Sequence, residues 1–485
     1  MRKYCLLIAT IWVCNCVAAQ TPTTATVGFK IKNAVSGTVT VSLAVNNTHF
    51  WGNKRKLSIK KDGTVLLTVP PSETGRIFFE YEGRSSYIFL QKGDKVFIEI
   101  DTAAQPSFNI TGSNAAGQML LSAKSQPQST SQIDELLNKD STVLQLKTHI
   151  AKEKEEKINA FKELFLQKKI NAAFLFYATK RLEYVYQAAV ADRVYSRWSG
   201  RTRDYRAAPE EYKAYYQTLY PDSLLNNKKG PQVFTYITYA DSYLRHYLYF
   251  FKRHISGDSL LPPEAERKKM IIGYTRSKFT TNQEYLEAYE LYLFYLQKQY
   301  EKSMLGLYSN FTMKYPASQY TRILDSNNRE FLAYYKAASE SFAPDQVLIK
   351  DYENINSVAE LKEKMKGKKY FVDMWATWCG PCKEEFAYKD ELNSFLKKNG
   401  IDILYLSIDD KTFDEKWKEM IKYYKLSGYH VRTNKTFSED VSKTLNLKYI
   451  PRYMYVNEKG EIISQETARP SDKEKLYSEI ASYLK

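Results

Sequence analysis

Residues 372–386 read VDMWATWCGPCKEEF and contain two of the five cysteines in this 485-residue chain, Cys379 and Cys382. The other three cysteines lie within the first sixteen residues. The apolar residues before the pair are typical of a buried strand, and Pro381 suits the first turn of a helix, where its missing N–H is not needed. The sequence therefore predicts that the pair lies where a strand ends and a helix begins.

A pair of thiols at such a junction has the properties of a redox switch. The free N–H groups and the dipole at the start of a helix favour an anion, so we expect Cys379 to form a thiolate at a lower pH than an ordinary thiol. Cys382, one turn inside the helix, is expected to be buried and less reactive. A zinc site would need a second pair of ligands. The pattern therefore favours reversible disulfide chemistry over a structural or metal site.

The residues around the pair predict alternating strands and helices, an order that is typical of an α/β layer fold. A turn is expected at Lys459-Gly460. This interpretation assigns strands to 368–376 and 401–409, helices to 381–400 and 412–428, and two strands to 449–463.

Two regions of different character precede this unit. Residues 20–112 hold short β-rich runs separated by turns such as Asp62-Gly63, which predicts a small sandwich or barrel. Residues 113–343 have apolar residues at helical spacing and little Gly or Pro, which predicts a helical domain. Its tyrosine stripes are interpreted as packing positions whose hydroxyls reach water, with a ligand groove as the alternative. Residues 344–485 form the third domain.

Residues 1–19 have the pattern of a secretory signal peptide: a positive start, a short apolar core and small residues before Gln20. Cleavage after Ala19 would leave only the pair near position 380. A lipid anchor on Cys14 or Cys16 is the alternative, although the residues before each lack the expected small side chain. Export places the chain in an oxidising compartment, where cysteines are ordinarily used for structural disulfides.

The net charge of +16 is compatible with association with an anionic membrane surface. The lysines are scattered among acidic residues and no basic run with interleaved aromatics occurs, so we expect no nucleic-acid partner. The five histidines are dispersed, and we interpret them as surface or interface residues and expect no metal. They are His49, His149, His246, His254 and His430.

WCGPC behind VDMWAT, with Ile450-Pro451 about seventy residues later, resembles thioredoxin. The preceding APDQVLIKD, the long segment between the two middle strands and the signal peptide resemble more specifically the TlpA/ResA-like thiol-disulfide oxidoreductases of the bacterial cell envelope. The resemblance covers roughly Pro344 to Lys485. It implies a multidomain chain with a C-terminal α/β thioredoxin-like fold, preceded by an all-β domain and an all-α domain.

The resemblance also assigns catalytic roles. It makes Cys379 the attacking thiolate and Cys382 the thiol that resolves the mixed disulfide. Asp373, six residues before Cys379, becomes a buried acid that takes the proton of Cys382, and the alternative is a strand-end aspartate in water. Thioredoxin has a lysine near this acid, whereas the second strand here carries Tyr405 and Leu406, so the tuning of Cys382 stays open.

Substrate binding is assigned by the same resemblance. Pro451 should follow a cis peptide bond and face the disulfide, and the backbone of Ile450 should pair with an extended substrate. Trp375 and Trp378 should form the sides of the site, and Gly380 and Pro381 are the remaining residues expected to bind substrate.

The implied function is reduction of disulfides in envelope proteins, with a redox-active disulfide and no cofactor. The implied partners are disulfide-containing clients and a membrane or envelope electron donor, and the setting is the periplasm or cell envelope of a Gram-negative bacterium, with a role like that in cytochrome c maturation. Two alternatives are a ligand- or partner-binding scaffold with an accessory thioredoxin unit, and a disulfide oxidase or isomerase.

Overall fold

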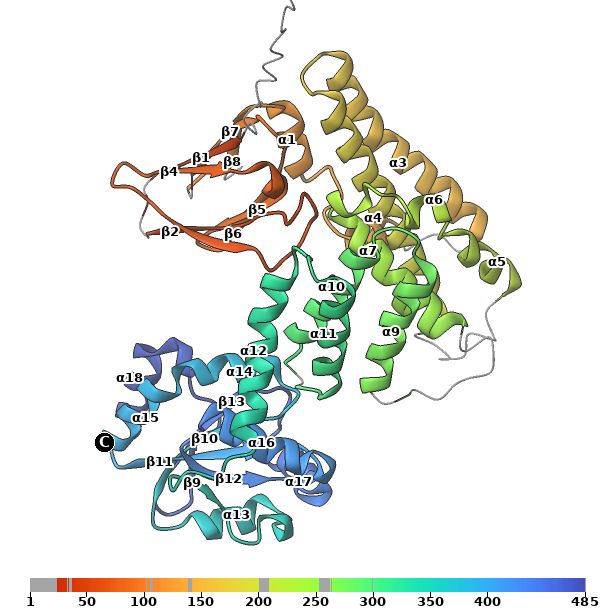
Figure 1. The fold of residues 1–485 in the computed structure, drawn as a ribbon. Helices are drawn as coiled ribbons and strands as arrows, with labels where there is room; N and C mark the ends of the chain where they lie inside the picture. Colours follow the sequence, from red (N-terminus) through yellow and green to blue (C-terminus); the bar gives the residue numbers. More distant parts are fainter. Residues whose placement is uncertain are drawn as a thin grey trace, which may run out of the picture. The chain divides into compact units, whose positions relative to one another are not determined.

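The computed structural model describes residues 24–32, 34, 37–101, 103–104, 108–137, 142–199, 209–252, 262, 264–298 and 300–484 (Figure 1). The expected signal peptide, its three cysteines and His254 lie outside these residues. The chain divides into two compact units, residues 1–262 with 270–286, and residues 263–269 with 287–485.

The first unit begins with a β-sandwich. One sheet has the strand order β4-β1-β7-β8 and the other has the order β3-β2-β5-β6. Their inner faces share a core in which Phe29 of the first sheet lies edge-on to Phe79 of the second, with ring centroids 5.5 Å apart. The strands are β1 (Ala25–Lys32), β2 (Thr38–Ser42), β3 (Lys54–Ser58), β4 (Thr64–Val69), β5 (Gly75–Tyr81), β6 (Arg84–Leu90), β7 (Lys95–Asp101) and β8 (Phe108–Gly112).

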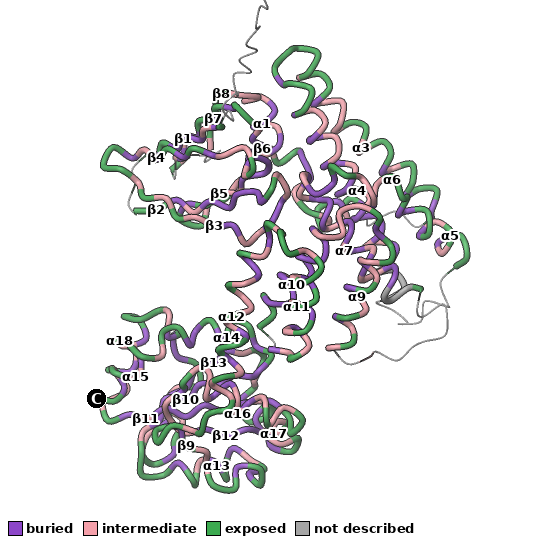
Figure 2. The backbone as a smooth tube through the Cα atoms, in the orientation of Figure 1, coloured by how far each residue is buried: buried purple, intermediate pink, exposed green. Residues whose placement is uncertain are grey.

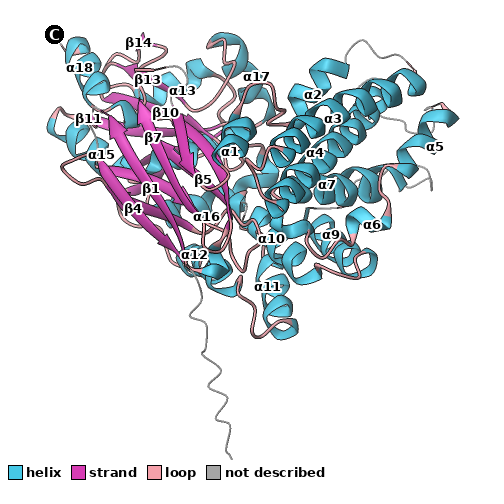
Figure 3. Ribbon diagram, turned by 90° about the horizontal axis from the view of Figure 1, so that it is seen from above, coloured by secondary structure: helices cyan, strands magenta, loops and turns pink. Residues whose placement is uncertain are grey.

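Helices follow the sandwich in the sequence, as expected. The long helix α3 starts at a capping box, in which the Thr142 side chain accepts from the Gln145 N–H and the Gln145 side chain accepts from the Thr142 N–H. Helix α4 packs against α3 and α7 (Figure 3). The helices are α1 (Ala115–Ser122), α2 (Thr130–Leu136), α3 (Val143–Leu166), α4 (Ala172–Ser199), α5 (Glu210–Thr218), α6 (Asp222–Leu225), α7 (Thr235–Asp241), a π-helical segment (Ser242–Lys252), α9 (Glu264–Lys278) and α10 (Gln283–Leu296).

The tyrosines of this helical region differ from the expectation that their hydroxyls reach water. Tyr236 and Tyr239 are fully buried. Their hydroxyls donate to the carbonyls of Leu225 at 2.7 Å and Leu219 at 3.0 Å. The helices between which they lie leave terminal carbonyls without intrahelical partners, and the phenols satisfy those carbonyls inside the core.

The second unit contains residues 264–269 of α9, residues 287–296 of α10, two further helices that precede the predicted α/β region, and a six-stranded mixed sheet in the order β14-β13-β10-β11-β12-β9. Strands β10, β11, β12 and β9 run parallel, while β13 is antiparallel to β10 and to β14. The elements are α11 (Ser303–Lys314), α12 (Thr321–Ala338), β9 (Gln346–Leu348), α13 (Val358–Met365), β10 (Lys369–Trp375), α14 (Gly380–Glu385), α15 (Lys389–Lys398), β11 (Ile401–Ser407), α16 (Asp414–Tyr424), β12 (Gly428–Arg432), α17 (Lys435–Thr444), β13 (Arg452–Val456), β14 (Ile462–Ser464) and α18 (Glu474–Tyr483).

The central strands of this sheet are almost entirely buried, whereas the outer sides of its helices are exposed (Figure 2). The carboxyl ends of β10 and β11 meet at one edge, where the Ile408 N–H donates to the Trp375 carbonyl at 3.0 Å. The single helix predicted for 381–400 is wrong in one respect. A 3₁₀ turn at Phe386–Tyr388 divides it into α14 and α15, and Phe386 there turns inward to pack on Trp375, with ring centroids 5.4 Å apart.

Within the part of the chain that the structure describes, no helix is both long and apolar enough to span a bilayer.

Candidate redox site

Cys379 and Cys382 form a disulfide at the junction of the β10 loop and α14, with Cα atoms 5.4 Å apart. Cys379 is the N-cap of the helix, and its sulfur accepts a hydrogen bond from the Cys382 N–H at 3.2 Å. Cys382 is fully buried, whereas 4% of Cys379 is exposed. The N–H group aimed at the Cys379 sulfur would stabilise a thiolate there after reduction.

The surface beside Cys379 is formed by residues predicted to bind substrate. Trp378 is 55% exposed, and Gly380 and Pro381 are also exposed. The exposed indole leaves apolar surface uncovered next to Cys379, as the prediction of a binding surface requires. Trp375, in contrast, is fully buried and packs in the core, so it does not form a wall of the surface.

The Ile450–Pro451 peptide bond is cis, in agreement with the expectation from the resemblance. Pro451 is buried and Ile450 is partly exposed. Tyr449, the residue before them, is 53% exposed and donates a hydrogen bond to Glu466. The pairing of Ile450 with a substrate backbone stays a prediction.

Asp373 lies on β10, in register with Tyr405 of β11 on one side and Tyr453 of β13 on the other. All three side chains are buried. Asp373 Oδ1 and the Tyr453 hydroxyl have no hydrogen-bond partner among the described residues. Burial, reinforced by the negative charge of Glu385, raises the pKa of Asp373 well above its ordinary value. The alternative of a solvated aspartate at the strand end is therefore wrong.

Glu385 is a residue that the sequence reasoning did not select. It is 7% exposed on α14 and accepts hydrogen bonds from the Ser471 N–H and the Ser471 hydroxyl, both at 2.9 Å. An Arg469 nitrogen lies 4.0 Å from its Oε1 atom. These contacts hold the Glu385 side chain in place, so that its negative charge acts on Asp373. The available signal in the sequence was the spacing of Glu385, because a residue three positions after Cys382 lies on the same face of a helix as that cysteine.

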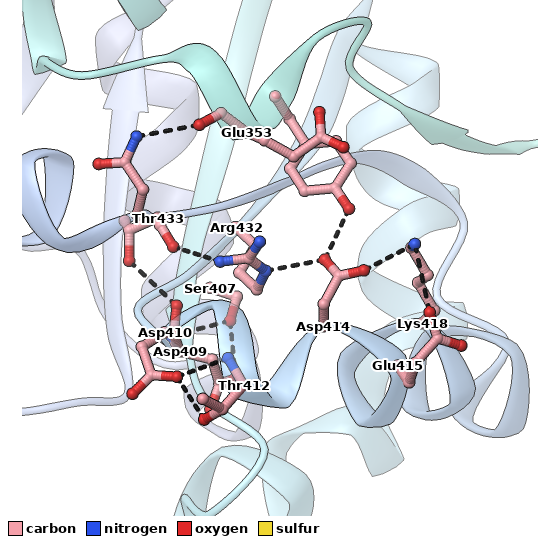
Figure 4. A network of polar contacts seen from close by, with 12 residues as sticks. Glu353, Ser407, Asp409, Asp410, Thr412, Asp414, Glu415, Lys418, Arg432 and Thr433 are labelled. Carbon is pink, nitrogen blue, oxygen red and sulfur yellow. Dashed lines mark hydrogen bonds and ion pairs between the residues drawn. The ribbon is translucent and has the colours of Figure 1, made fainter.

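Asp409 fixes the loop that precedes Cys379. Its carboxylate accepts from the Thr377 N–H at 2.8 Å, the Thr377 hydroxyl at 2.9 Å and the Ser407 hydroxyl at 2.7 Å. The network continues along the same sheet edge, where Arg432 donates to Asp414 at 2.9 Å (Figure 4). The loop carrying Cys379 is therefore held by side chains from the neighbouring strand ends.

Lys383 directly follows Cys382 and is 7% exposed. Its ammonium group donates to the carbonyl oxygens of Thr377 at 3.0 Å and Lys298 at 3.3 Å. Burial, together with the positive charges of Lys416 and Lys298, lowers the pKa of Lys383 to about 8. No sequence pattern indicated this burial, because a lysine on a helix is ordinarily exposed.

The histidines form no metal site in the described part of the chain, where no group of three or more potential ligands occurs. The expectation of surface or interface positions is wrong for His49, which is 4% exposed, and for His430, which is fully buried. Its ring stacks on Tyr405 with centroids 5.0 Å apart, and burial lowers its pKa to about 3. A neutral, stacked imidazole fills the core beside the row that contains Asp373.

Comparisons with known proteins concern the second unit. The family model described as Redoxin matches residues 319–480. The thiol-disulfide oxidoreductase ResA of Bacillus thuringiensis subsp. konkukian is 33% identical over 117 residues, which cover 24% of this chain and 64% of that protein. ResA of Bacillus subtilis is 24% identical over 136 residues, which cover 28% of this chain and 71% of that protein.

The chain thus covers less than two thirds of the length of the first of these relatives. Among solved structures, the thioredoxin domain of a thiol-disulfide oxidoreductase from Bacteroides vulgatus is 24% identical, with a TM-score of 0.23, and the match covers 25% of this chain and 84% of that one. A thiol:disulfide interchange protein from Bacteroides sp. is 26% identical, with a TM-score of 0.22, and the match covers 25% and 76%. The C-terminal region is a thioredoxin-like redoxin domain with ResA-type relatives.

Proposed function

We propose that this chain, which carries a redoxin domain over residues 319–480, is an exported thiol-disulfide oxidoreductase that reduces disulfides in cell-envelope proteins. The observation that carries the proposal is the Cys379–Cys382 disulfide, in which Cys379 is 4% exposed beside the exposed Trp378 and Cys382 is fully buried. A purely structural disulfide between residues three apart would add little to the stability of the fold, because the closed loop is too short to restrict the unfolded chain strongly.

The reaction follows from the different environments of the two sulfurs. In the reduced protein, the Cys379 thiolate attacks a client disulfide, which forms a mixed disulfide and releases one client thiolate. The Cys382 thiolate then attacks the Cys379 sulfur, which restores the internal disulfide and releases the second client thiolate. Two electrons pass to the client in total.

Asp373 accepts the proton of the buried Cys382 thiol and later returns it. Its ionised carboxylate, made more basic by burial, accepts the proton from Cys382 before the second attack. When an envelope electron donor reduces the disulfide again, the protonated carboxyl returns the proton to Cys382. A buried site without such a group would have to form the Cys382 thiolate against its desolvation cost.

Insulin reduction tests the activity directly. The mature chain, supplied with dithiothreitol, is expected to accelerate the precipitation of insulin B chains, whereas Cys379→Ser should not accelerate it. Equal rates for the two proteins would remove the proposal. A Lys366→Met variant is a suitable control, because it changes an exposed ion pair with Glu363 and leaves the disulfide intact.

The setting and partners of the reaction are part of the proposal. The signal-peptide pattern supports export to the periplasm or cell envelope of a Gram-negative bacterium. Clients are then exported proteins with disulfides, and the electron donor lies in or near the membrane. Detection of the chain in the envelope fraction, beginning at Gln20, tests the localisation. A first residue of Cys14 or Cys16 carrying lipid would show that the chain is anchored instead.

A binding role for the β-sandwich is the second candidate function. The outer face of the β4-β1-β7-β8 sheet has a groove of about 450 Å³, and its lining includes Leu66, which is 62% exposed, and Phe97, which is 51% exposed. Trapping with a Cys382→Ala variant separates the two roles. Many disulfide-linked clients favour a general reductase, whereas a specific non-covalent partner without trapped clients favours a scaffold.

A further inference from the structure

The Lys383 side chain donates hydrogen bonds to two segments of the backbone. One is the loop that carries Cys379, and the other comes before the predicted thioredoxin-like region. One of its bonds, 3.0 Å long, reaches the carbonyl of Thr377, two residues before Cys379. The other, 3.3 Å long, reaches the carbonyl of Lys298, which follows α10. A buried ammonium group carries a large desolvation cost unless hydrogen bonds compensate it. Both bonds end on backbone oxygens, so the cation fixes the position of the two chain segments relative to each other.

The segment on the far side of Lys383 is firmly held. We call Lys298 and Tyr300 the post-α10 segment. The Tyr300 ring stacks on Tyr334 of α12, with ring centroids 4.1 Å apart and an angle of 2°. Its hydroxyl donates to Glu330 at 2.8 Å, and the Lys298 ammonium lies 3.2 Å from the same carboxylate. The Lys298 carbonyl is therefore a fixed anchor.

A second set of contacts, between aromatic side chains, links Tyr300 to the end of strand β10. The Tyr300 and Tyr424 hydroxyls are 3.2 Å apart. Tyr424 packs on Phe386, and Phe386 packs on Trp375, with ring centroids 5.1 Å and 5.4 Å apart. Trp375 is the last residue of β10, so the packing continues from α12 to the start of the loop that carries Cys379.

We propose that Lys383 is a positioning residue that couples the geometry of the Thr377–Cys379 loop, and with it the dithiol–disulfide equilibrium, to the post-α10 segment. This inference rests on the proposed function only in taking the Cys379–Cys382 pair as the redox centre. The cation acts in two ways. It holds the Thr377 carbonyl in place, and its positive charge favours the Cys379 thiolate over the disulfide.

The test measures the equilibrium of the full-length chain with glutathione, by quenching and counting alkylated cysteines. Lys383→Met keeps the apolar stem and removes the cation, so the equilibrium should shift about threefold or more toward the disulfide. Lys383→Arg keeps the charge and the donors and should keep the equilibrium close to that of the wild type. Lys366→Met is the matched control, because it removes the same charge from an exposed pair, and it should leave the equilibrium unchanged.

A second set of variants approaches the contact from the other side. Tyr300→Ala removes the stack on Tyr334 and loosens the Lys298 anchor while leaving Lys383 intact. It should shift the equilibrium in the same direction, whereas Tyr300→Phe, which keeps the stack, should shift it less. The double variant Lys383→Met/Tyr300→Ala should shift the equilibrium by less than the sum of the single free-energy effects, because both changes break one connection.

An unchanged equilibrium in both Lys383→Met and Tyr300→Ala would overturn the inference, as would strictly additive effects in the double variant. If Lys383→Met does not fold, the comparison of Tyr300→Ala with Tyr300→Phe still tests the inference, because equal equilibria in these two variants would overturn it. Failure of the proposed function is distinguishable, because it would appear as absent insulin reduction by the wild-type chain, while the glutathione equilibrium can be measured without any client.

Discussion

Tyr405 on β11 lies in register with Asp373 on β10, and both side chains are buried. The thioredoxin pattern has a lysine on this second strand near the buried acid. A phenol brings no positive charge that would offset the burial of the carboxylate. The pKa of Asp373 is therefore raised without compensation from this neighbour, and Asp373 in turn raises the pKa of Tyr405, which burial already raises.

Asp373→Asn should slow client reduction by about 100-fold or more, because the amide cannot accept the proton of Cys382. The variant retains the shape of the side chain, so the disulfide should still form. Stopped-flow reduction of a small fluorescent disulfide checks the rate. An unchanged rate would show that Cys382 loses its proton by another route.

The same residue makes stability depend on pH. The folded chain holds the Asp373 proton above the ordinary pKa of 3.8, where the unfolded chain has lost it. The stabilisation is therefore fully present below about pH 4 and declines as the pH rises toward the raised folded pKa. Urea unfolding of the oxidised protein, compared between pH 5 and pH 8, should show a smaller decline in Asp373→Asn than in the wild type.

Glu385→Gln should lower the pKa of Asp373, because it removes the nearby negative charge while the amide oxygen still accepts from Ser471. Infrared difference titration of protonated carboxyl groups, with Asp373→Asn as the reference, measures this pKa. Glu384→Gln is the control, since Glu384 is exposed on the same helix. A titration midpoint equal to that of the wild type would show that burial alone sets the pKa.

Asp409→Ala should destabilise the oxidised domain by about 1–3 kcal/mol, because the buried Thr377 N–H loses its acceptor. Asp410→Ala is the matched control. Asp410 is exposed and accepts from the Thr412 N–H, so its removal should cost about 1 kcal/mol or less. Equal losses of unfolding free energy in the two variants would contradict the assigned role of Asp409.

The parts of this site that follow from local sequence were predictable. The local sequence placed the C-x-x-C pair at a strand–helix junction, and the resemblance to thioredoxin assigned the roles of Asp373 and Pro451. Hydrophobic periodicity also indicated the central strands β10 and β11 and the helices that follow each of them, whereas the elements β9, α13, β12 and α17 were not predicted.

The parts that depend on packing between distant segments were not predictable from the sequence. The burial of Lys383 depends on Lys298, which lies 85 residues earlier, and the fixed charge of Glu385 depends on Ser471, 86 residues later. The 3₁₀ turn between α14 and α15 reflects the inward position of Phe386, which helical periodicity does not encode. The buried tyrosines bond to carbonyls whose location only the assembled helices determine.

The reduction potential of the Cys379–Cys382 pair, measured against glutathione in the mature chain, tests the central claim most directly. Thioredoxin has a potential of about −270 mV and the oxidant DsbA one of about −120 mV, a difference of roughly 7 kcal/mol for two electrons. A reductase requires a potential at or below about −230 mV, and we predict a value in that range. A value near that of DsbA would contradict the account and make the protein a disulfide oxidase.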